Sequence, residues 1–362
     1  MSTTDKLIVV LGATGLQGAS VVDTFLEIPG WKVRGVTRNP DGAKGRALAA
    51  RGVEVVKADL NDAASLTAAF TGAHAIFAVT DFWAPFFDPA TEAKLAPGQL
   101  MNEYCFDEEV RQAKNIFHAV IPVLDGLERF VYSTLPGIRK WSKGKYTWAY
   151  HFDSKQAAVD YLEEKLPELA AKTSYVNLGL YVTNERLMAP LKPTKIGDGI
   201  YQLARVASSD TKFPFVVTRK DTGPHVKVAM IDLPPRSNLL VYSEMASWKE
   251  YIKIFEEVTG LKLVYKEVSI EEADRASPWH HIGREVGEVK QFTQELGWHG
   301  GDPRMLFHDD VSYLNDLFDE PTIDRASSAG EERDLIEDDE PEGMDGKRGL
   351  VGSEGLEKSK CL

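Results

Sequence analysis

The feature that most constrains the fold of this chain is a glycine-rich turn that directly follows an apolar run. Residues 7–11 read LIVVL, residues 12–18 read GATGLQG, and an amphipathic helical pattern covers residues 17–27. Glycines at this spacing allow a tight turn, close approach of a pyrophosphate to the backbone, and close packing of a helix on a strand. The helix N-terminus adds unpaired N–H groups and a dipole that favours phosphate. The pattern predicts a dinucleotide-binding unit; a glycine-rich turn without a ligand is the alternative.

The rest of the first half alternates short β-branched runs with amphipathic helical patterns. We expect strands at residues 7–11, 32–37, 53–57, 75–79, 129–133 and 174–178, and helices at 17–27, 42–50, 62–70, 103–124 and from about 152. Repeated strand–helix–strand units with nearly continuous apolar strands favour a parallel sheet covered on both faces. The predicted fold class is therefore α/β, with a Rossmann-type doubly wound sheet in residues 1–187.

The second half of the sequence changes character near residue 188. Prolines punctuate its loops, and we expect short strands at 226–231 and 263–268 and helices at 246–259 and 283–296. This pattern predicts a smaller α+β lobe, residues 188–323, over the carboxyl edge of the sheet, with residues 174–187 crossing into it. Residues 324–362 hold 12 acidic and six basic residues with few aromatic or β-branched ones, and we expect a disordered acidic tail. The tail is either solubilising or a docking peptide for a basic partner.

Composition limits where the chain works and what it binds. No window approaches about 18 consecutive apolar residues, and the polar start before residue 7 leaves no room for a secretory signal, so we expect no membrane association. Two cysteines, Cys105 and Cys361, fit a reducing compartment. A net charge of −13 opposes direct nucleic-acid binding. We expect a cytoplasmic protein, also nuclear if it is regulatory, whose partner is a small-molecule substrate or a protein.

The ends of the second and third predicted strands indicate which dinucleotide is bound. Thr37-Arg38-Asn39 stands where an acidic residue would accept hydrogen bonds from the adenosine ribose. A guanidinium there can pair with a ribose 2′-phosphate, so NADP(H) is expected to be preferred, with NAD(H) possible and a ligand-free surface arginine as the alternative. Asp59 is placed to accept from the adenine amino group, or else to cap the next helix, a role that Asn61 or Asp62 could also take.

Three further motifs follow in order along the chain. Thr80-Asp-Phe-Trp83 comes after the fourth strand, Tyr132-Ser-Thr-Leu135 after the fifth, and His151-Phe-Asp-Ser-Lys155 opens the next helix. With the glycine-rich turn and Asp59, these residues closely resemble the NmrA-like family, an atypical branch of the short-chain dehydrogenase/reductases, over about residues 6–318. The resemblance implies a Rossmann fold with a small C-terminal lobe that binds NAD(P). Its members include NADPH-dependent reductases and nucleotide-sensing regulators that bind a transcription factor or a signalling protein.

The resemblance also implies a set of cofactor contacts. The phosphate loop would be Gly12, Thr14, Gly15, Leu16, Gln17 and Gly18; the adenosine end would be Arg38, Asn39, Asp59 and Leu60; and the nicotinamide-ribose wall would be Thr80, Asp81, Phe82 and Lys155. Residues 178–184 (LGLYVTN) match the loop that covers the nicotinamide. Metal binding is not expected, because the adjacent His280 and His281 lack a partner carboxylate at ligand spacing.

The predicted catalytic residues depart from the superfamily pattern. Its usual enzymes place Tyr-x-x-x-Lys on one helix face, whereas this chain has His151 in place of the tyrosine and retains Lys155. The proton could come from His151, from Lys155 alone, or from Tyr146 or Tyr150. Ser133 stands at the position of the substrate-polarising serine. Each residue also has a structural reading: Lys155 as a ribose ligand, His151 as a cofactor contact, and Ser133 as a strand-end hydroxyl.

Aromatic residues flank the predicted cleft and suit a flat apolar substrate, although a lid packed by its own aromatics explains them equally. The candidate substrate residues are Trp83, Trp141, Tyr146, Trp148, Tyr181 and Asn184. Two functions remain open on this sequence. One is an NADP(H)-dependent oxidoreductase that reduces a carbonyl, an imine or an enone, and the other is a non-catalytic NADP(H) sensor that docks a regulatory partner.

Overall fold

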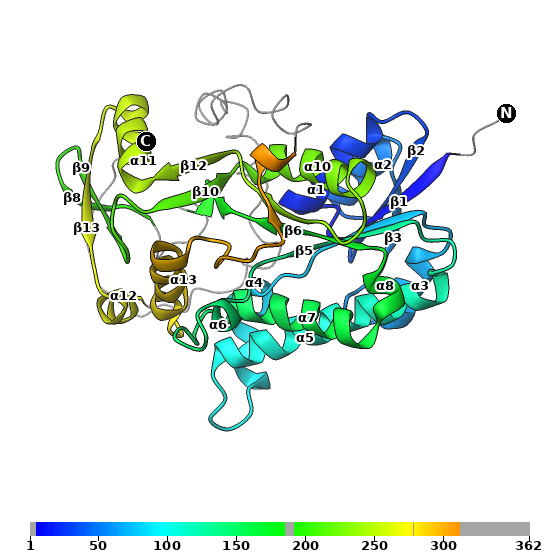
Figure 1. The fold of residues 1–362 in the computed structure, drawn as a ribbon, viewed down its shortest axis with the longest axis horizontal. Helices are drawn as coiled ribbons and strands as arrows, with labels where there is room; N and C mark the ends of the chain where they lie inside the picture. The colour runs from blue at the N-terminus through cyan, green and yellow to red at the C-terminus, as the bar shows by residue number, and fades with distance from the viewer. Residues whose placement is uncertain (1–4, 185–191, 278, 312–362) are drawn as a thin grey trace, which may run out of the picture. The chain divides into compact units, whose positions relative to one another are not determined.

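An eight-stranded parallel sheet forms the centre of the computed structural model, which describes residues 5–184, 192–277 and 279–311 (Figure 1). The strand order is β3-β2-β1-β4-β5-β6-β11-β14. The order turns back at β1 and β4, and ligands of such sheets bind at the carboxyl ends of the strands where this reversal occurs. The strands are β1 (Lys6–Val10), β2 (Trp31–Thr37), β3 (Glu54–Lys57), β4 (Ala75–Ala78), β5 (Arg129–Thr134), β6 (Thr173–Leu178), β11 (Asn238–Val241) and β14 (Met305–Leu306).

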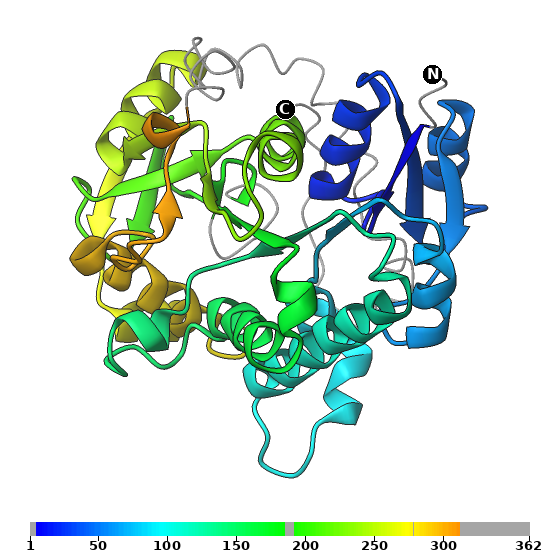
Figure 2. The ribbon, with the colours of Figure 1, turned by 45° about the vertical axis from the view of Figure 1, so that its right-hand side comes forward.

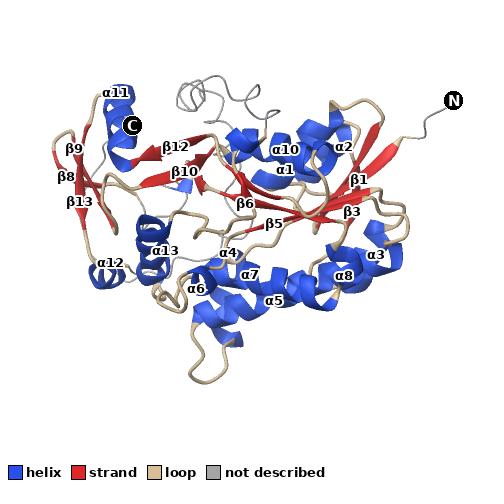
Figure 3. Ribbon diagram, viewed as in Figure 1, coloured by secondary structure: helices blue, strands red, loops and turns tan. Residues whose placement is uncertain are grey.

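Helices cover both faces of this sheet, as its apolar strands require (Figure 3). One face carries α1 (Leu16–Leu26), α2 (Ala43–Ala50) and α10 (Thr218–Lys227), and the other carries α3 (Ala63–Phe70), α5 (Met101–Val120), α7 (Tyr150–Lys165) and α8 (Pro167–Ala170). The predicted doubly wound Rossmann-type fold is confirmed.

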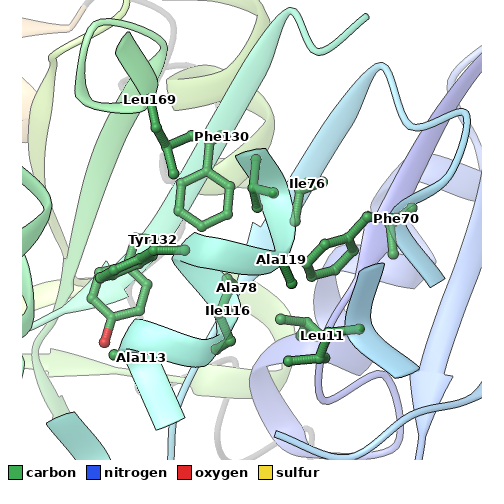
Figure 4. Packing of buried hydrophobic residues seen from close by; sticks show 14 of the residues in the cluster. Leu11, Phe70, Ile76, Ala78, Ala113, Ile116, Ala119, Phe130, Tyr132 and Leu169 are labelled. Atoms are coloured by element: carbon green, nitrogen blue, oxygen red, sulfur yellow. The ribbon is translucent and has the colours of Figure 1, made fainter. Parts of the chain in front are cut away.

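The core beneath α3, α5 and α7 shows why these segments fold as predicted. Phe117 of α5 packs edge-to-face on Phe130 and Tyr132 of β5, and all three side chains are buried. Figure 4 shows Phe130 and Tyr132 packed with other buried residues of this core. Burying large apolar side chains from neighbouring strands and one helix stripe is the main favourable term in folding such a layer. It holds β4 and β5 in place, and the carboxyl ends of these strands carry Thr80 and Ser133.

The remaining elements gather at the carboxyl end of the main sheet (Figures 1 and 2). Two three-stranded sheets lie there, one of β7 (Leu180–Tyr181), β10 (Lys212–Val216) and β12 (Glu244–Ser247), the other of β8 (Thr194–Gly197), β9 (Ile200–Arg205) and β13 (Lys262–Glu267). The helices are α4 (Trp83–Phe87), α6 (Ile138–Trp141), α11 (Trp248–Thr259), α12 (Ile270–Ala276) and α13 (Ile282–Leu296). Short helical turns lie at Pro89–Lys94, Ile121–Val123, Val228–Asp232 and His308–Asp310.

One prediction for the second half was wrong, and one helix starts later than expected. Residues 226–231 are not a strand but the end of α10 and a π-turn, because Val226, Val228 and Met230 are buried in a helix that packs against α1. Tertiary packing here overrides the β-propensity of a valine-rich run. The helix expected at 246–259 begins at Trp248, since Ser247 and Glu250 form a capping box at the end of β12.

The second half of the chain is also shared with the main sheet. β11, β14 and α10 all follow residue 188, yet β11 and β14 extend the Rossmann sheet and α10 covers it. The smaller lobe is therefore not one continuous segment. The boundary expected near residue 187 and the tail at 324–362 lie outside the described residues. In the described part of the chain, no helix has the length and apolar character needed to cross a membrane.

Candidate functional site

The glycine-rich turn adopts the geometry that its sequence predicts. Gly12 has φ +65°, in the left-handed region, and a Cβ on Gly18 would lie 2.1 Å from the Gly12 carbonyl oxygen. Gly15 begins α1 with no side-chain cap, and a Cβ there would meet nothing closer than 3.5 Å. Gly12 and Gly15 are exposed. The backbone N–H groups at the start of α1 are thus accessible to an anion.

The tip of β2 carries an arginine that is available for a ligand. The Arg38 side chain is exposed and makes no hydrogen bond or ion pair with the residues that the structure describes. The neighbouring Asn39 is also exposed, and its N–H donates to Thr37 Oγ1 at 3.3 Å. Thr37 pairs with Lys57 across the two strands, which places a second exposed cation nearby.

Asp59 does not cap the next helix. Asp62 caps α3, its Oδ1 accepting from the N–H groups of Ala64 and Ser65. Within the described residues, Asp59 Oδ1 accepts only the N–H of Asn61, at 2.8 Å. The capping role therefore belongs to Asp62, and the Asp59 carboxylate remains at the sheet edge beside Leu60, whose carbonyl accepts from Asn115.

Lys155 lies in a buried polar cluster that the sequence reasoning did not foresee. Its Nζ donates to Glu109 Oε1 at 2.5 Å and lies 3.3 Å from both oxygens of Thr80. Glu109, on α5, also accepts from Thr80 Oγ1 at 2.8 Å and Ser154 Oγ at 2.5 Å. Its side chain is 1% exposed, so these donors replace the hydrogen bonds to water that the buried carboxylate has lost. The sequence did indicate a buried acidic residue here, because Glu109 lies at helical spacing between the apolar Cys105 and Ala113.

A second network joins residues that are far apart in the sequence. Ser133 Oγ donates to Gln17 Oε1 at 2.7 Å, and Gln17 Nε2 donates to the Tyr181 hydroxyl at 2.6 Å. These residues come from β5, the start of α1 in the glycine-rich motif, and β7. Burial raises the pKa of Tyr181, so its hydroxyl is neutral at physiological pH. Three predicted site residues thus meet at the carboxyl edge of the sheet.

His151 is paired with a carboxylate from α13. His151 Nδ1 lies 2.6 Å from Glu285 Oε1, and the same oxygen accepts the His151 backbone N–H at 2.7 Å. Glu285 Oε2 accepts from Asn102 Nδ2 at 2.7 Å. Burial also raises the pKa of the nearby Asp153 to about 6. Glu285, like Glu109, could have been found as an acidic residue on an apolar helix face, between Ile282 and Val289.

One turn further along α13, Glu288 binds the segment that leads into α7. Its Oε2 accepts the backbone N–H groups of Thr147 at 2.6 Å and Trp148 at 2.7 Å. The Arg284 guanidinium lies over the Trp148 ring at 4.2 Å. Helix α13 therefore holds the start of the helix that carries His151 and Lys155.

The aromatic candidates do not line one surface. The ring centroids of Trp83 and His151 lie 4.9 Å apart, and Trp83 packs with Phe82, Phe86 and Phe87. The Phe82 side chain is buried in this cluster and does not line the cleft. Trp141 and Tyr146 belong to a different cluster, around Phe292 and Trp298. Trp148 contacts His281 and Tyr150. The structure therefore does not bring these aromatic candidates together in one cleft; Trp83 lies beside His151, and Tyr181 lies beside Gln17.

The remaining candidates are placed as follows. Asp81 is exposed and its Oδ1 accepts from the N–H groups of Trp83 and Ala84 at the start of α4. Asn184 is partly exposed at the end of the described loop. Among the described residues, no three His, Cys, Asp or Glu side chains are grouped to hold a metal ion. His280 and His281 pair with different acids, Glu92 and Asp274.

An open cavity of about 560 Å³ lies beside the aromatic cluster of Trp83, Phe86 and Phe87. It is lined by Gln99 and Asn102, before and at the start of α5, and by Arg275 and Trp279, at the end of α12 and in the loop that follows it. Asn102 is fully buried, and its Oδ1 has no hydrogen-bond partner among the described residues. Because Asn102 Nδ2 donates to Glu285, this cavity is linked by hydrogen bonds to His151.

The parallel sheet and the glycine-rich turn at its reversal define a Rossmann-type α/β protein. A sequence profile of the NmrA-like family matches residues 4–330, and the chain belongs to that family. The oxidoreductase FrzB of Cladobotryum sp, which contains an NmrA-like family domain, is 28% identical over 278 residues; the match covers 72% of this chain and 76% of FrzB.

Solved structures share the same fold. The negative transcriptional regulator NmrA in complex with NADP has a TM-score of 0.69 at 16% identity and covers 93% of this chain and 99% of its own. The NADPH-dependent quinone oxidoreductase QOR2 of Escherichia coli, complexed with NADPH, has a TM-score of 0.61 at 18% identity, with coverage of 89% and 99%. At these identities the likeness shows the fold, which both an enzyme and a regulator use.

Proposed function

We propose that this protein is an NADP(H)-dependent oxidoreductase that reduces a carbonyl, imine or enone in a small apolar metabolite by hydride transfer. The observation that carries the proposal is the meeting of the glycine-rich turn, the Ser133–Gln17–Tyr181 network and the His151–Lys155 helix face at one edge of the sheet. The name of the relative FrzB, an oxidoreductase, favours the enzyme.

The residues at this edge fit a dinucleotide phosphate. The start of α1 has no side-chain cap, so its N–H groups are accessible to the pyrophosphate. Arg38 is an exposed guanidinium that no described residue engages, as a 2′-phosphate ligand requires, and Lys57 adds a second cation next to it. Because Asp62 caps α3, the Asp59 carboxylate is left to accept from the adenine amino group.

The chain's own residues then prepare the reaction. NADPH, when bound, supplies the hydride. Lys155 is held by Glu109 and Thr80, which fixes its ammonium near the carboxyl end of β4, where it can donate to the nicotinamide ribose. Ser133 presents its hydroxyl beside Gln17 and can orient the polar atom of the substrate. Trp83 and Phe86 cover the His151 side of the edge and exclude water from it.

The test is NADPH consumption by the purified protein with panels of ketones, enones and imines, followed by the absorbance of the reduced nicotinamide. Turnover with at least one class is expected. Replacing Lys155 alone would leave Glu109 buried without its cation, which is costly, so the matched variant is the double change Lys155→Met with Glu109→Gln. We expect this variant to stay folded and to lose turnover. A protein that binds NADPH but consumes none with any class would refute the proposal.

The second candidate is a non-catalytic NADP(H) sensor that binds a transcription factor or a signalling protein. The likeness to a negative transcriptional regulator, at a TM-score of 0.69, favours it. The distinguishing result is a partner whose binding depends on the nucleotide in a protein without turnover. Pull-down with and without NADPH and NADP⁺ measures this, and deletion of residues 324–362 tests the acidic segment as the docking element.

A further inference from the structure

On the basis of the proposed function, we infer that His151 is the proton donor of the reduction and that Glu285 is the residue that positions it. The juxtaposition that carries this inference is a buried carboxylate of α13 on the Nδ1 of a histidine one helical turn before Lys155. The histidine occupies the position at which the superfamily's tyrosine acid stands. Neither Tyr146 nor Tyr150 replaces that tyrosine, since Tyr146 lies in the separate cluster around Phe292 and Tyr150 packs against Phe106 and Trp148.

Glu285 is held on all sides. Its side chain is 0% exposed, and its two oxygens accept three hydrogen bonds: from His151 Nδ1 at 2.6 Å, from the His151 backbone N–H at 2.7 Å, and from Asn102 Nδ2 at 2.7 Å. A carboxylate this far from water needs such donors, and two of the three come from His151. The site is therefore built around the hydrogen-bonded pair of Glu285 and His151.

The carboxylate determines which nitrogen does chemistry. With Nδ1–H bonded to Glu285, the ring exchanges its second proton at Nε2. The His151 side chain is 13% exposed, so the ring is reachable from the edge of the sheet. His151 and Lys155 are four residues apart on α7 and share one face.

The reaction balances with these groups. Hydride from NADPH forms a new C–H bond at the electrophilic carbon, while the electron pair of the C=O or C=N bond moves to oxygen or nitrogen. The proton on His151 Nε2 then bonds to that atom, giving an alcohol or an amine and NADP⁺. The neutral ring takes a proton from water to begin the next cycle.

Other charged groups surround this pair within the described part of the chain. Glu288 lies on α13, Asp153 and Lys155 lie on the helix of His151, Arg139 of α6 donates its N–H to Asp153, Asp81 follows β4, and Glu109 lies on α5. Lys155 is already paired with Glu109, and Glu288 is bound to two backbone N–H groups. The rings of Phe82, Trp83 and Phe152 lie 4.8 to 5.9 Å from the imidazole and lower the local dielectric. The direct hydrogen bond makes Glu285 the dominant influence on the ring.

Glu285 also binds a backbone N–H of α7, so a test must separate charge from structure. Glu285→Gln keeps an acceptor for that N–H and removes the charge. Glu288→Gln is the matched control, because Glu288 lies one turn further on the same helix and binds two backbone N–H groups of the same segment but no imidazole. Thermal unfolding and NADPH titration verify that both variants fold and bind nucleotide.

Two readouts follow. With a substrate, kcat of Glu285→Gln is expected to fall about tenfold or more at neutral pH while its KM changes little, and kcat of Glu288→Gln is expected to fall by less. His151→Ala is expected to lose turnover and to regain part of it with added imidazole.

The outcomes separate the two proposals. Turnover by Glu285→Gln with the same kcat as Glu288→Gln overturns the role of Glu285. Turnover by His151→Ala at the rate of the unaltered protein overturns the assignment of the proton donor, while the oxidoreductase function stands. No turnover with any substrate class, despite NADPH binding, overturns the oxidoreductase function and the proton-donor role with it.

Discussion

Arg38 offers the sharpest test of the cofactor assignment, because its removal should alter one ligand interaction and nothing else. The side chain is exposed and makes no bond within the described residues, so Arg38→Ala leaves no buried group without a partner. We expect the free energy of unfolding to change by less than about 0.5 kcal/mol. Any loss of nucleotide affinity then reports on the ligand contact itself.

The magnitude follows from the chemistry of that contact. A hydrogen bond to a charged group contributes about 1.5 to 3 kcal/mol, which corresponds to a factor of about 10 to 150 in Kd. Because the guanidinium is exposed, solvent and salt screen it, and we expect the lower end of this range at physiological ionic strength and a larger loss at low salt. NADH and NAD⁺ lack the 2′-phosphate, so their affinities should stay nearly unchanged.

Calorimetric titration with NADPH, NADP⁺, NADH and NAD⁺ measures the four affinities in parallel. Lys253→Ala is the control, since it removes the same charge from α11, far along the chain from the glycine-rich turn. Equal losses for the phosphorylated and unphosphorylated nucleotides in Arg38→Ala would refute the reasoning. So would an Arg38→Ala protein that binds all four as tightly as the unaltered protein.

Three further predictions concern the loop and the pH dependence of stability. Gly15→Ala should fold normally but weaken NADPH binding, since its Cβ would meet no protein atom closer than 3.5 Å. Gly18→Ala should lower Tm, because its Cβ would lie 2.1 Å from a carbonyl oxygen. Calorimetry measures the binding and thermal unfolding measures Tm, and equal Tm values for the two variants would contradict this prediction. Burial lowers the pKa of His225 to about 3 and of His308 to about 4, below the ordinary 6.5. The unfolded chain therefore takes up protons first, and stability present above pH 6.5 is lost as the pH falls, by about 2 kcal/mol per histidine between pH 7 and 5. Denaturant titrations should show this loss, reduced in a His225→Leu, His308→Phe double variant. Burial raises the pKa of Asp153 to about 6, so its ionisation opposes folding. The Asp153→Asn protein should be more stable than the unaltered protein by about 1 to 3 kcal/mol above pH 6, and the two should be equally stable near pH 4. A stability difference that is the same at both pH values would argue against this cause.

Local pattern was a reliable guide in the first half of the chain. The strands expected at 7–11 and 129–133 and the helix at 17–27 match β1, β5 and α1 within one residue at each end. These segments carry their own signals: a continuous apolar run, a glycine-rich turn, and a helical period. Each signal is read from neighbouring residues, so no knowledge of the rest of the chain was needed.

Pattern was less reliable where burial depends on distant residues. Val226 and Val228 look like strand residues, but α10 packs so closely on α1 that a Cβ on Gly223 would lie 2.2 Å from the Ser20 carbonyl oxygen. A helix at that position therefore depends on a segment about 200 residues earlier. The capping box at Ser247 and Glu250 is the opposite case, because it was legible in the sequence and would have corrected the start of α11.

The candidate site divides in the same way. The kinds of residue at the edge of the sheet, including the glycine-rich turn, Arg38, Ser133, His151 and Lys155, are properties of short motifs that a sequence carries in full. The hydrogen-bond partners of these residues are not part of the same motifs. Glu109 reaches Lys155 from α5, and Glu285 reaches His151 from α13, 134 residues further on. A carboxylate on an apolar helix face indicates that it must be satisfied somewhere. Which cation or imidazole satisfies it depends on how the helices pack, because hydrogen bonds form across a few ångströms of space and not along the chain.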